Sequence, residues 1–153
     1  MVQSVLGNVM NRESLEELKN AGLKATVSRV KILELFHASS VDHLSVEEVH
    51  RQLIDDGMDI GLATVYRVLA QFESVGIVIK STFDATKVIY ELNNGPHHDH
   101  IVCLGCGRVD EFHDPVIEAR QKMAAESLGY LLSEHQLSLY GYCGQCRPKP
   151  NKA

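Results

Sequence analysis

Residues 45–76 read SVEEVHRQLIDDGMDIGLATVYRVLAQFESVG, and this stretch predicts two helices joined by a short turn. The first helix begins after Ser45, a capping residue, and Glu48 three positions later completes a capping box. Gly57 ends this helix. The second helix is expected from about Gly61 to Val75, because apolar side chains recur there at spacings of three, four and three residues: Leu62, Val65, Leu69 and Phe72.

The residues on either side of this stretch complete the order of elements. Before it, helices are expected over residues 11–20 and from Thr26, a second capping residue, onward. After it, Ile77–Phe83 and Lys87–Leu92 are β-rich and are joined by a three-residue turn, as in a hairpin. Helix, turn, helix and hairpin is the order of a winged helix-turn-helix, which we predict for residues 1–92.

A second lobe is expected beyond residues 93–96, a hinge that reads Asn-Asn-Gly-Pro and favours neither helix nor strand. The elements predicted there are strands around Ile101–Leu104 and Arg108–Phe112, a helix begun by Asp114 and Pro115 and ended at Leu128–Gly129, and an alternating segment over Tyr130–Tyr142. We therefore predict an α+β protein, with a small α/β lobe over residues 97–147 and a polar tail over 148–153.

All four cysteines fall in two Cys-x-x-Cys pairs, Cys103/Cys106 and Cys143/Cys146. Two intervening residues allow both thiolates of a pair to reach one ion, and four thiolates at about 2.3 Å form a closed tetrahedral zinc site. Disulfides are disfavoured because the sequence shows no secretion signal. The cysteines therefore predict a structural zinc site, with a thiol redox switch as the alternative.

The run His97-His98-Asp99-His100 is a second cluster of metal-binding side chains. Side chains of an extended segment alternate between its two faces, so His98 and His100 would share one face and His97 and Asp99 the other. Imidazole and carboxylate ligands suit Fe, Mn, Co or Zn. One strand would thus supply two different metal sites, and a solvated polar loop is the alternative.

Composition excludes several classes of protein. Apolar residues make up 44% and charged residues 23% of the 153 positions, as in soluble globular domains, and no apolar run is long enough to span a membrane. Because no secretion signal is seen, we expect a cytoplasmic location. The sequence contains neither His-Glu-x-x-His nor Gly-x-Ser-x-Gly nor a phosphate-binding glycine loop. We therefore expect no enzyme and no small-molecule substrate.

Charge favours DNA binding only locally. Residues 1–92 hold nine Lys and Arg against thirteen Asp and Glu, a balance of −4 that would repel phosphate at long range. Residues 18–33, however, have no acidic side chain and include Lys24 and Arg29, while Thr64 and Arg67 lie on the outer stripe of a predicted helix. One basic face would be formed by Lys19, Lys24, Arg29, Lys31 and Arg67. A winged-helix lobe that contacts proteins is the alternative.

Four segments give the chain a resemblance to a known family. They are Gly22-Leu23-Lys24-Ala25-Thr26, Gly61-Leu62-Ala63-Thr64-Val65-Tyr66-Arg67-Val68-Leu69, His97-His98-Asp99-His100-Ile101-Val102-Cys103-Leu104-Gly105-Cys106-Gly107 and Leu139-Tyr140-Gly141-Tyr142-Cys143. On these segments the chain resembles the ferric uptake regulator (Fur) family over residues 12–146. The resemblance implies an N-terminal winged-helix lobe that binds DNA and a C-terminal dimerisation lobe.

The resemblance also implies roles for individual residues. It assigns the four cysteines to a structural zinc site. It implies a regulatory ferrous site between the lobes, with the ligands His43, Glu91, His98 and His100 and with Glu111 as a further ligand. It implies a second site in the dimerisation lobe, formed by His97, Asp99, Glu118 and His135. Tyr66 and Arg67 match positions of the family's recognition helix, and Lys24 matches a minor-groove contact. Together with Arg29 and Thr64, these residues are the expected DNA contacts.

We therefore predict a transcriptional repressor that uses Fe(II) as corepressor to control iron-uptake genes, with Mn(II), Co(II) or Zn(II) as substitutes. Its partners would be double-stranded operator DNA and further copies of itself, as a homodimer or tetramer. Glu111 stands where peroxide-sensing relatives have Asp, which favours an iron sensor. The alternatives are a peroxide, zinc or manganese sensor of the same family and a zinc-stabilised protein-interaction module without DNA binding.

Overall fold

The computed structural model describes residues 12–40, 43–84 and 86–148. The chain divides into two compact units between Gly95 and Pro96, a point within the predicted hinge. Across the described ranges, no helix combines the length and the apolar character that are needed to cross a bilayer.

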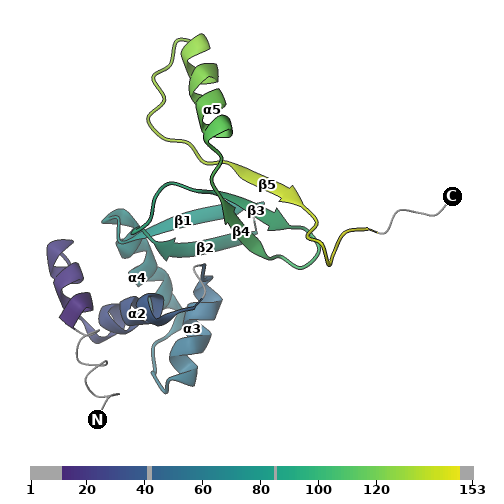
Figure 1. Ribbon diagram of the computed structural model, residues 1–153. Helices are drawn as coiled ribbons and strands as arrows, with labels where there is room; N and C mark the ends of the chain where they lie inside the picture. The colour runs from purple at the N-terminus through teal and green to yellow at the C-terminus, as the bar shows by residue number, and fades with distance from the viewer. Residues whose placement is uncertain (1–11, 41–42, 85, 149–153) are drawn as a thin grey trace. The chain divides into compact units, whose positions relative to one another are not determined.

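Four helices make up most of the described part of the first unit. Residues 12–20 are helical, and Asn11, with which this helix was predicted to begin, lies outside the described residues. The other three helices are α2 (Val27–Ala38), α3 (Val46–Asp55) and α4 (Leu62–Ser74), as Figure 1 shows. The predicted capping box is confirmed, because the Glu48 N–H donates to Ser45 Oγ at 3.2 Å and the Ser45 N–H donates to Glu48 Oε2 at 2.7 Å.

The core of the first unit is apolar and is shared by all its helices. Val65, Leu69 and Phe72 on α4 are buried, as the helical spacing predicts. Leu62, predicted to lie on the same stripe, is instead 39% exposed. The buried stripe runs through Val65, Val68, Leu69 and Phe72 at i, i+3, i+4 and i+7, and Leu62 is the first residue of the helix, before this stripe begins.

The predicted hairpin is present beside these helices (Figure 1). Strand β1 (Val78–Phe83) pairs antiparallel with β2 (Lys87–Leu92), in a register that joins Val78 to Leu92 and Phe83 to Lys87. A bridge between Leu44 and Tyr90, with backbone hydrogen bonds of 3.0 and 2.8 Å, holds the segment before α3 against β2. The order of elements is therefore that of a winged helix-turn-helix.

The second unit is a small sheet with one helix. Its elements are β3 (Asp99–Cys103), β4 (Val109–Phe112), α5 (Pro115–Ser127) and β5 (Ser138–Gly141). The central strand β3 pairs antiparallel with β4 and parallel with β5. Asp114 caps α5 as predicted, since its Oδ1 accepts from the N–H of Val116 at 2.8 Å.

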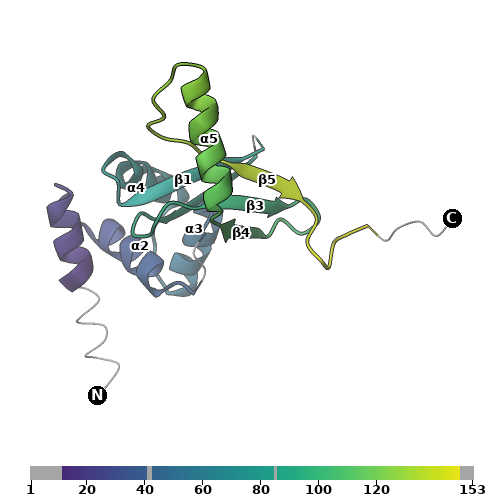
Figure 2. The ribbon, with the colours of Figure 1, turned by 45° about the horizontal axis from the view of Figure 1, so that its top comes forward.

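The segment after α5 departs from its predicted alternation over Tyr130–Tyr142. Only Ser138–Gly141 forms a strand, and the preceding residues form the loop that returns from α5 to β5 in Figure 2. The strand is short because β3 offers partners only from His100, opposite Ser138, to Cys103, opposite Gly141. An alternating sequence forms a strand only where a neighbouring strand can accept and donate its backbone hydrogen bonds.

Candidate metal centres and nucleic-acid interface

The four cysteines come together at one edge of the second sheet. Because β3 and β5 run parallel, their carboxyl ends meet at the same edge, where Cys103 is opposite Gly141. Cys106 follows β3 in a tight turn, closed by the Gly107 N–H on the Cys103 carbonyl at 2.8 Å. Cys143 and Cys146 follow β5 in a matching turn, closed by the Cys146 N–H on the Cys143 carbonyl at 3.0 Å.

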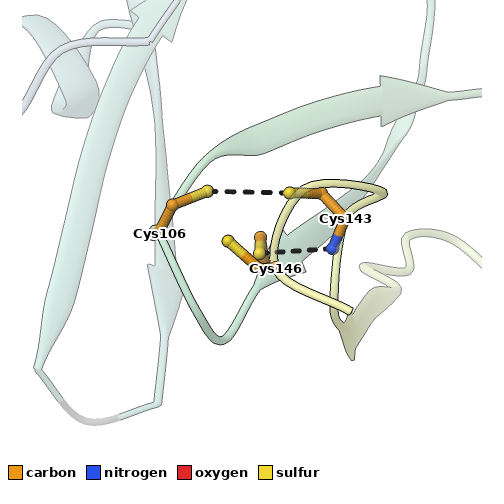
Figure 3. Close-up of side chains that lie close together, drawn as sticks. Cys106, Cys143 and Cys146 are labelled. Atoms are coloured by element: carbon orange, nitrogen blue, oxygen red, sulfur yellow. Dashed lines mark hydrogen bonds between the residues drawn. The ribbon is translucent and has the colours of Figure 1, made fainter. Parts of the chain in front are cut away.

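The sulfur atoms of this cluster have the spacing of a tetrahedral metal cage. All four lie within 4.8 Å of one another and none forms a disulfide. The Cys106 and Cys143 sulfurs are 3.9 Å apart and their side chains point toward each other in Figure 3. Four sulfurs at about 2.3 Å from a zinc ion would be separated by roughly 3.8 Å. The predicted cysteine set is therefore brought together in a geometry that fits zinc.

Electrostatics within the cysteine cluster also fit a cation. The N–H of Cys143 donates to Cys103 Sγ at 3.3 Å. This hydrogen bond, with backbone hydrogen bonds from Cys106 and Gly105 in the turn after β3, lowers the pKa of the Cys103 thiol to about 6. Hydrogen bonding to the neighbouring sulfurs, Cys143 first, raises the pKa of the Cys146 thiol to about 12. Neighbouring thiolates repel one another, so deprotonation of all four thiols is unfavourable in the absence of a cation. A bound divalent cation would stabilise all four thiolates at once.

Gly105 allows the two cysteine turns to approach each other. A Cβ at this position would lie 2.6 Å from the Cys146 Cβ and 2.9 Å from its Sγ. Any larger residue would therefore push Cys146 out of the cluster. The sequence marks Gly105 only as a turn residue, because the closeness of Cys146 follows from the pairing of β3 with β5.

A second group combines two histidines with two carboxylates in the same unit. His97 Nε2 lies 3.5 Å from Asp99 Oδ1 and 3.4 Å from Glu118 Oε1, and His135 Nε2 lies 3.1 Å from Glu118 Oε2. Glu118 comes from the first turn of α5 and His135 from the loop before β5. The structure thus brings together all four residues of the predicted second site, with ligand atoms within 4.8 Å of one another.

Asp99 gives this second group the character of a cation site. It is only 1% exposed, and neither carboxylate oxygen has a hydrogen-bond partner among the residues that the structure describes. Burying a charged group without hydrogen bonds is costly, so such groups commonly coordinate metals. The orphaned carboxylate and its imidazole neighbours therefore fit a divalent ion.

The opposite face of β3 carries the third set of candidate ligands. His98 and His100 have ring centroids 5.0 Å apart, and His98 Nε2 lies 3.6 Å from Glu111 Oε1. Glu111 lies directly opposite His100 in the β3–β4 register, which places the two side chains on one face. The alternation predicted for His97–His100 is thus confirmed, since His98 and His100 belong to one group and His97 and Asp99 to the other.

The first unit contributes the predicted ligands His43 and Glu91, which form an imidazole–carboxylate pair. His43 precedes α3 and Glu91 lies on β2, and the Leu44–Tyr90 bridge places these two residues side by side. His43 Nε2 lies 3.0 Å from Glu91 Oε2. Both residues are predicted ligands of the regulatory site. His37, by contrast, pairs with Glu17 at 2.8 Å, which supports a structural role.

The predicted DNA contacts differ in what they touch. Arg67 is exposed on α4, and Lys24 is exposed in the turn before α2. Tyr66 is 48% exposed, and its hydroxyl donates to Glu47 Oε1 at 3.1 Å, which raises the pKa of the Tyr66 phenol. An open hollow beside Tyr66 and Arg67 is lined on its other side by Lys80 of the hairpin.

Arg29 differs from the other predicted contacts because its guanidinium is engaged inside the first unit. It donates from Nε and Nη2 to Gln71 Oε1 at 3.1 and 2.9 Å, and from Nη1 to the Lys24 carbonyl at 2.7 Å. No local pattern in the sequence indicates that Arg29 pairs with Gln71. Its partner lies 42 residues away in the chain, beyond the reach of any local pattern.

Comparison with known proteins adds the deciding observation, because the model of the ferric uptake regulator family matches residues 20–140. The chain belongs to this family. Its members are metal-responsive transcriptional regulators rather than enzymes, and they bind DNA. The groups of candidate metal ligands and the winged helix-turn-helix are consistent with a metal-responsive regulator that binds DNA.

Individual relatives are similar over nearly their whole length. The chain is 56% identical to a ferric uptake regulation protein of Cupriavidus metallidurans, over 89% of this chain and 96% of that protein. It is 46% identical to the Francisella tularensis ferric uptake regulator solved with iron, with a TM-score of 0.79 and coverage of 83% and 96%. It is 27% identical to the Helicobacter pylori regulator described as having three functional metal binding sites, with a TM-score of 0.77 and coverage of 98% and 96%.

Proposed function

We propose that this regulator is a repressor that binds operator DNA of iron-uptake genes when Fe(II) is bound as corepressor. The observation that carries the proposal is the presence of two chemically different kinds of ligand set. One is an all-thiolate cluster suited to structural zinc, and the others combine imidazole with carboxylate, which suits Fe(II), Mn(II), Co(II) or Zn(II). The iron bound by the Francisella relative supports Fe(II) as the physiological ion.

We further propose that one ion is held jointly by ligands from the two units. His43 and Glu91 would come from the first unit, and His98, His100 and Glu111 from the second. The support is that each set is already assembled within its own unit, by the Leu44–Tyr90 bridge and by the β3–β4 register. An ion bound by both sets would favour one arrangement of the units, so metal and DNA would each tighten the binding of the other. His97, Asp99, Glu118 and His135 would form a separate site that supports the dimerisation unit.

DNA would be contacted by the exposed face of α4 and the turn before α2. Tyr66, Arg67 and Thr64 on α4 are proposed for the major groove, and Lys24 for the minor groove or a phosphate. Arg67 and Lys24 are exposed, which supports these roles. Good base-edge contacts contribute about 1–3 kcal/mol of discrimination each. Arg67→Ala should therefore weaken operator binding and relax its specificity, while Lys24→Ala should weaken binding and flatten its salt dependence.

A second copy of the chain is the proposed partner of the second unit. Helix α5 has no buried residue, and Val116, Met123 and Leu128 on or just after it are 68, 56 and 76% exposed. Strand β5 is an edge of its sheet, and its Leu139 is 40% exposed. An open sheet edge next to exposed apolar side chains is typical of an association surface. Covering this surface in a homodimer would present two winged helices to one near-palindromic operator.

The test is operator binding across a metal titration at fixed pH. The probe is the duplex that the full-length protein, loaded with Mn(II) under anaerobic conditions, selects from a random-sequence library. His43→Ala should abolish most of the metal response and keep the cysteine zinc. His50→Ala, which changes a histidine outside every candidate ligand group, is the matched control and should respond as the parent does. A His43→Ala variant with the parent's metal response would show that the proposed joint site is not the switch.

The same binding experiment, repeated with Fe(II), Mn(II) or Zn(II) and with peroxide added to the Fe(II)-loaded protein, distinguishes an iron sensor from a zinc, manganese or peroxide sensor. An effect of Zn(II) alone, or loss of binding with peroxide, would favour a zinc or a peroxide sensor. If the affinity for DNA is the same with and without each metal, the proposal that a metal acts as corepressor is wrong. Because histidines must be deprotonated at the ligating nitrogen to bind a metal, metal affinity should fall as the pH is lowered.

A further inference from the structure

The guanidinium of Arg29 joins three segments of the first unit. Arg29 lies in the first turn of α2, Gln71 lies near the end of α4, and the Lys24 carbonyl belongs to the turn before α2. Two donors, Nε and Nη2, converge on Gln71 Oε1 at 3.1 and 2.9 Å, and Nη1 donates to the Lys24 carbonyl at 2.7 Å. Three of the five guanidinium N–H groups are therefore used within the protein.

Both partners of Arg29 lie next to groups proposed to touch DNA. Gln71 is one helical turn beyond Arg67, at i+4, so it shares the same stripe of α4. The accepting carbonyl is that of Lys24 itself, whose side chain is exposed. The guanidinium thus fixes the backbone that carries Lys24 relative to the helix that carries Arg67.

We propose that Arg29 is a positioning residue that sets the separation between Lys24 and α4, and so allows one duplex to meet both at once. This proposal rests on the DNA binding proposed above. It replaces the direct DNA contact expected for Arg29 from its place in a basic stretch. The planar fork of arginine is essential to the proposal, because lysine keeps the charge but cannot bind two acceptors in this fixed geometry.

The experiment measures the affinity of the full-length, Mn(II)-loaded protein for the selected duplex as salt is varied. Arg29→Lys keeps the charge and loses the fork, and Gln71→Met loses the acceptor with little change in helix propensity. Because hydrogen bonds to charged groups are lost in both, each should weaken binding about tenfold. The double variant should be little weaker than either single one, because both remove the same interaction. Arg51→Lys and Gln52→Met, both at exposed positions of α3, are matched controls expected to bind as the parent does.

Two readouts separate positioning from other roles. Gln71→Met removes no charge. Even so, the slope of log affinity against log salt measured for this variant should become shallower, as it does for Lys24→Ala. The change should be up to about 0.9 if one phosphate contact is lost. Lys24→Ala should also reduce the affinity for the duplex by a smaller factor in the Arg29→Lys background than in the parent. Thermal unfolding is measured on every variant, so that loss of folded protein is not counted as loss of affinity.

Three outcomes would overturn the proposal. If Arg29→Lys binds as the parent does and Gln71→Met has no effect, Arg29 acts as a simple charge. If both variants melt earlier but the cost of Lys24→Ala and the salt slope are unchanged, the interaction is only structural. If the parent selects no duplex at all, the proposed function fails, and the proposal for Arg29 fails with it; the first two outcomes leave DNA binding intact.

Discussion

The two units of this regulator are stabilised in different ways. The first has a continuous apolar core, to which α2, α3, α4 and the hairpin all contribute fully buried side chains. In the described part of the second, the buried residues are Asp99, His100, Val102 and Cys103, of which all but Val102 are candidate metal ligands. A unit of about 50 residues buries too little apolar surface to be stable without metals or association. The first unit thus has an apolar core of its own, while the second is expected to depend for its stability on the metals and the partner proposed above.

The largest effect that this comparison predicts is on the cysteine cluster. Structural zinc contributes about 10–16 kcal/mol in small zinc-dependent domains, so Cys103→Ser or Cys143→Ser should abolish tight zinc binding and weaken dimerisation. The cooperative unfolding of the first unit should remain, because all four cysteines lie in the second. Zinc content by mass spectrometry and the dimer by sedimentation are the measurements. One zinc per chain and an intact dimer in either variant would break the comparison.

The converse change is made in the apolar core. Phe72 is fully buried on α4, and Phe72→Ala should destabilise the first unit by about 3–5 kcal/mol while the zinc content stays at the parent's value. Leu62→Ala on the same helix is the control, and it should cost much less because Leu62 is 39% exposed. Denaturant unfolding followed by circular dichroism measures both. Equal costs for the two variants would contradict the position of the core stripe.

A smaller effect is expected at Gly105, where the second unit is packed around its cysteines. Gly105→Ala places a Cβ 2.6 Å from that of Cys146, and overpacking of this kind costs about 1–3 kcal/mol, here seen as weaker zinc affinity. Gly144→Ala, in the turn that carries Cys143 and Cys146, is the control because its Cβ would meet nothing within 4 Å. Competition with a zinc chelator measures the difference. If both variants hold zinc alike, the two turns are not tightly packed.

The smallest effect concerns the cap of α3. Ser45→Ala should cost about 1 kcal/mol at neutral pH. Burial raises the pKa of Glu48, but hydrogen bonds from the Ser45 N–H and hydroxyl outweigh this effect and hold the pKa below its ordinary value of 4.5. A depressed carboxyl pKa stabilises the fold above the unfolded value and loses this effect as pH falls through the folded one. The cost of Ser45→Ala in unfolding free energy should therefore shrink below pH 4.5. In a Glu48→Gln background, the cost of Ser45→Ala should show no such pH dependence, and denaturant unfolding at several pH values measures both.

Local patterns predicted much of the fold. The caps at Thr26, Ser45 and Asp114 and the hairpin follow from residues close together in sequence, and all are found as expected. Local patterns failed where the outcome depends on a distant partner. Of the alternating segment predicted over Tyr130–Tyr142, only Ser138–Gly141 forms a strand, since the length of β3 sets how far pairing can extend.

The candidate sites divide in the same way. The sequence by itself determined the two cysteine pairs and the alternation of His97–His100, because ligand spacing and strand pleat act over two or three residues. The family resemblance, rather than local spacing, implied that Glu118 and His135 lie beside His97, and the structure brings them together. Only the tertiary structure decided that Gly105 lies against Cys146 and that Arg29 is hydrogen-bonded to Gln71. These contacts join residues that are far apart in the chain. These contacts form because strands pair and helices pack, and the spacing of residues within one element cannot predict them.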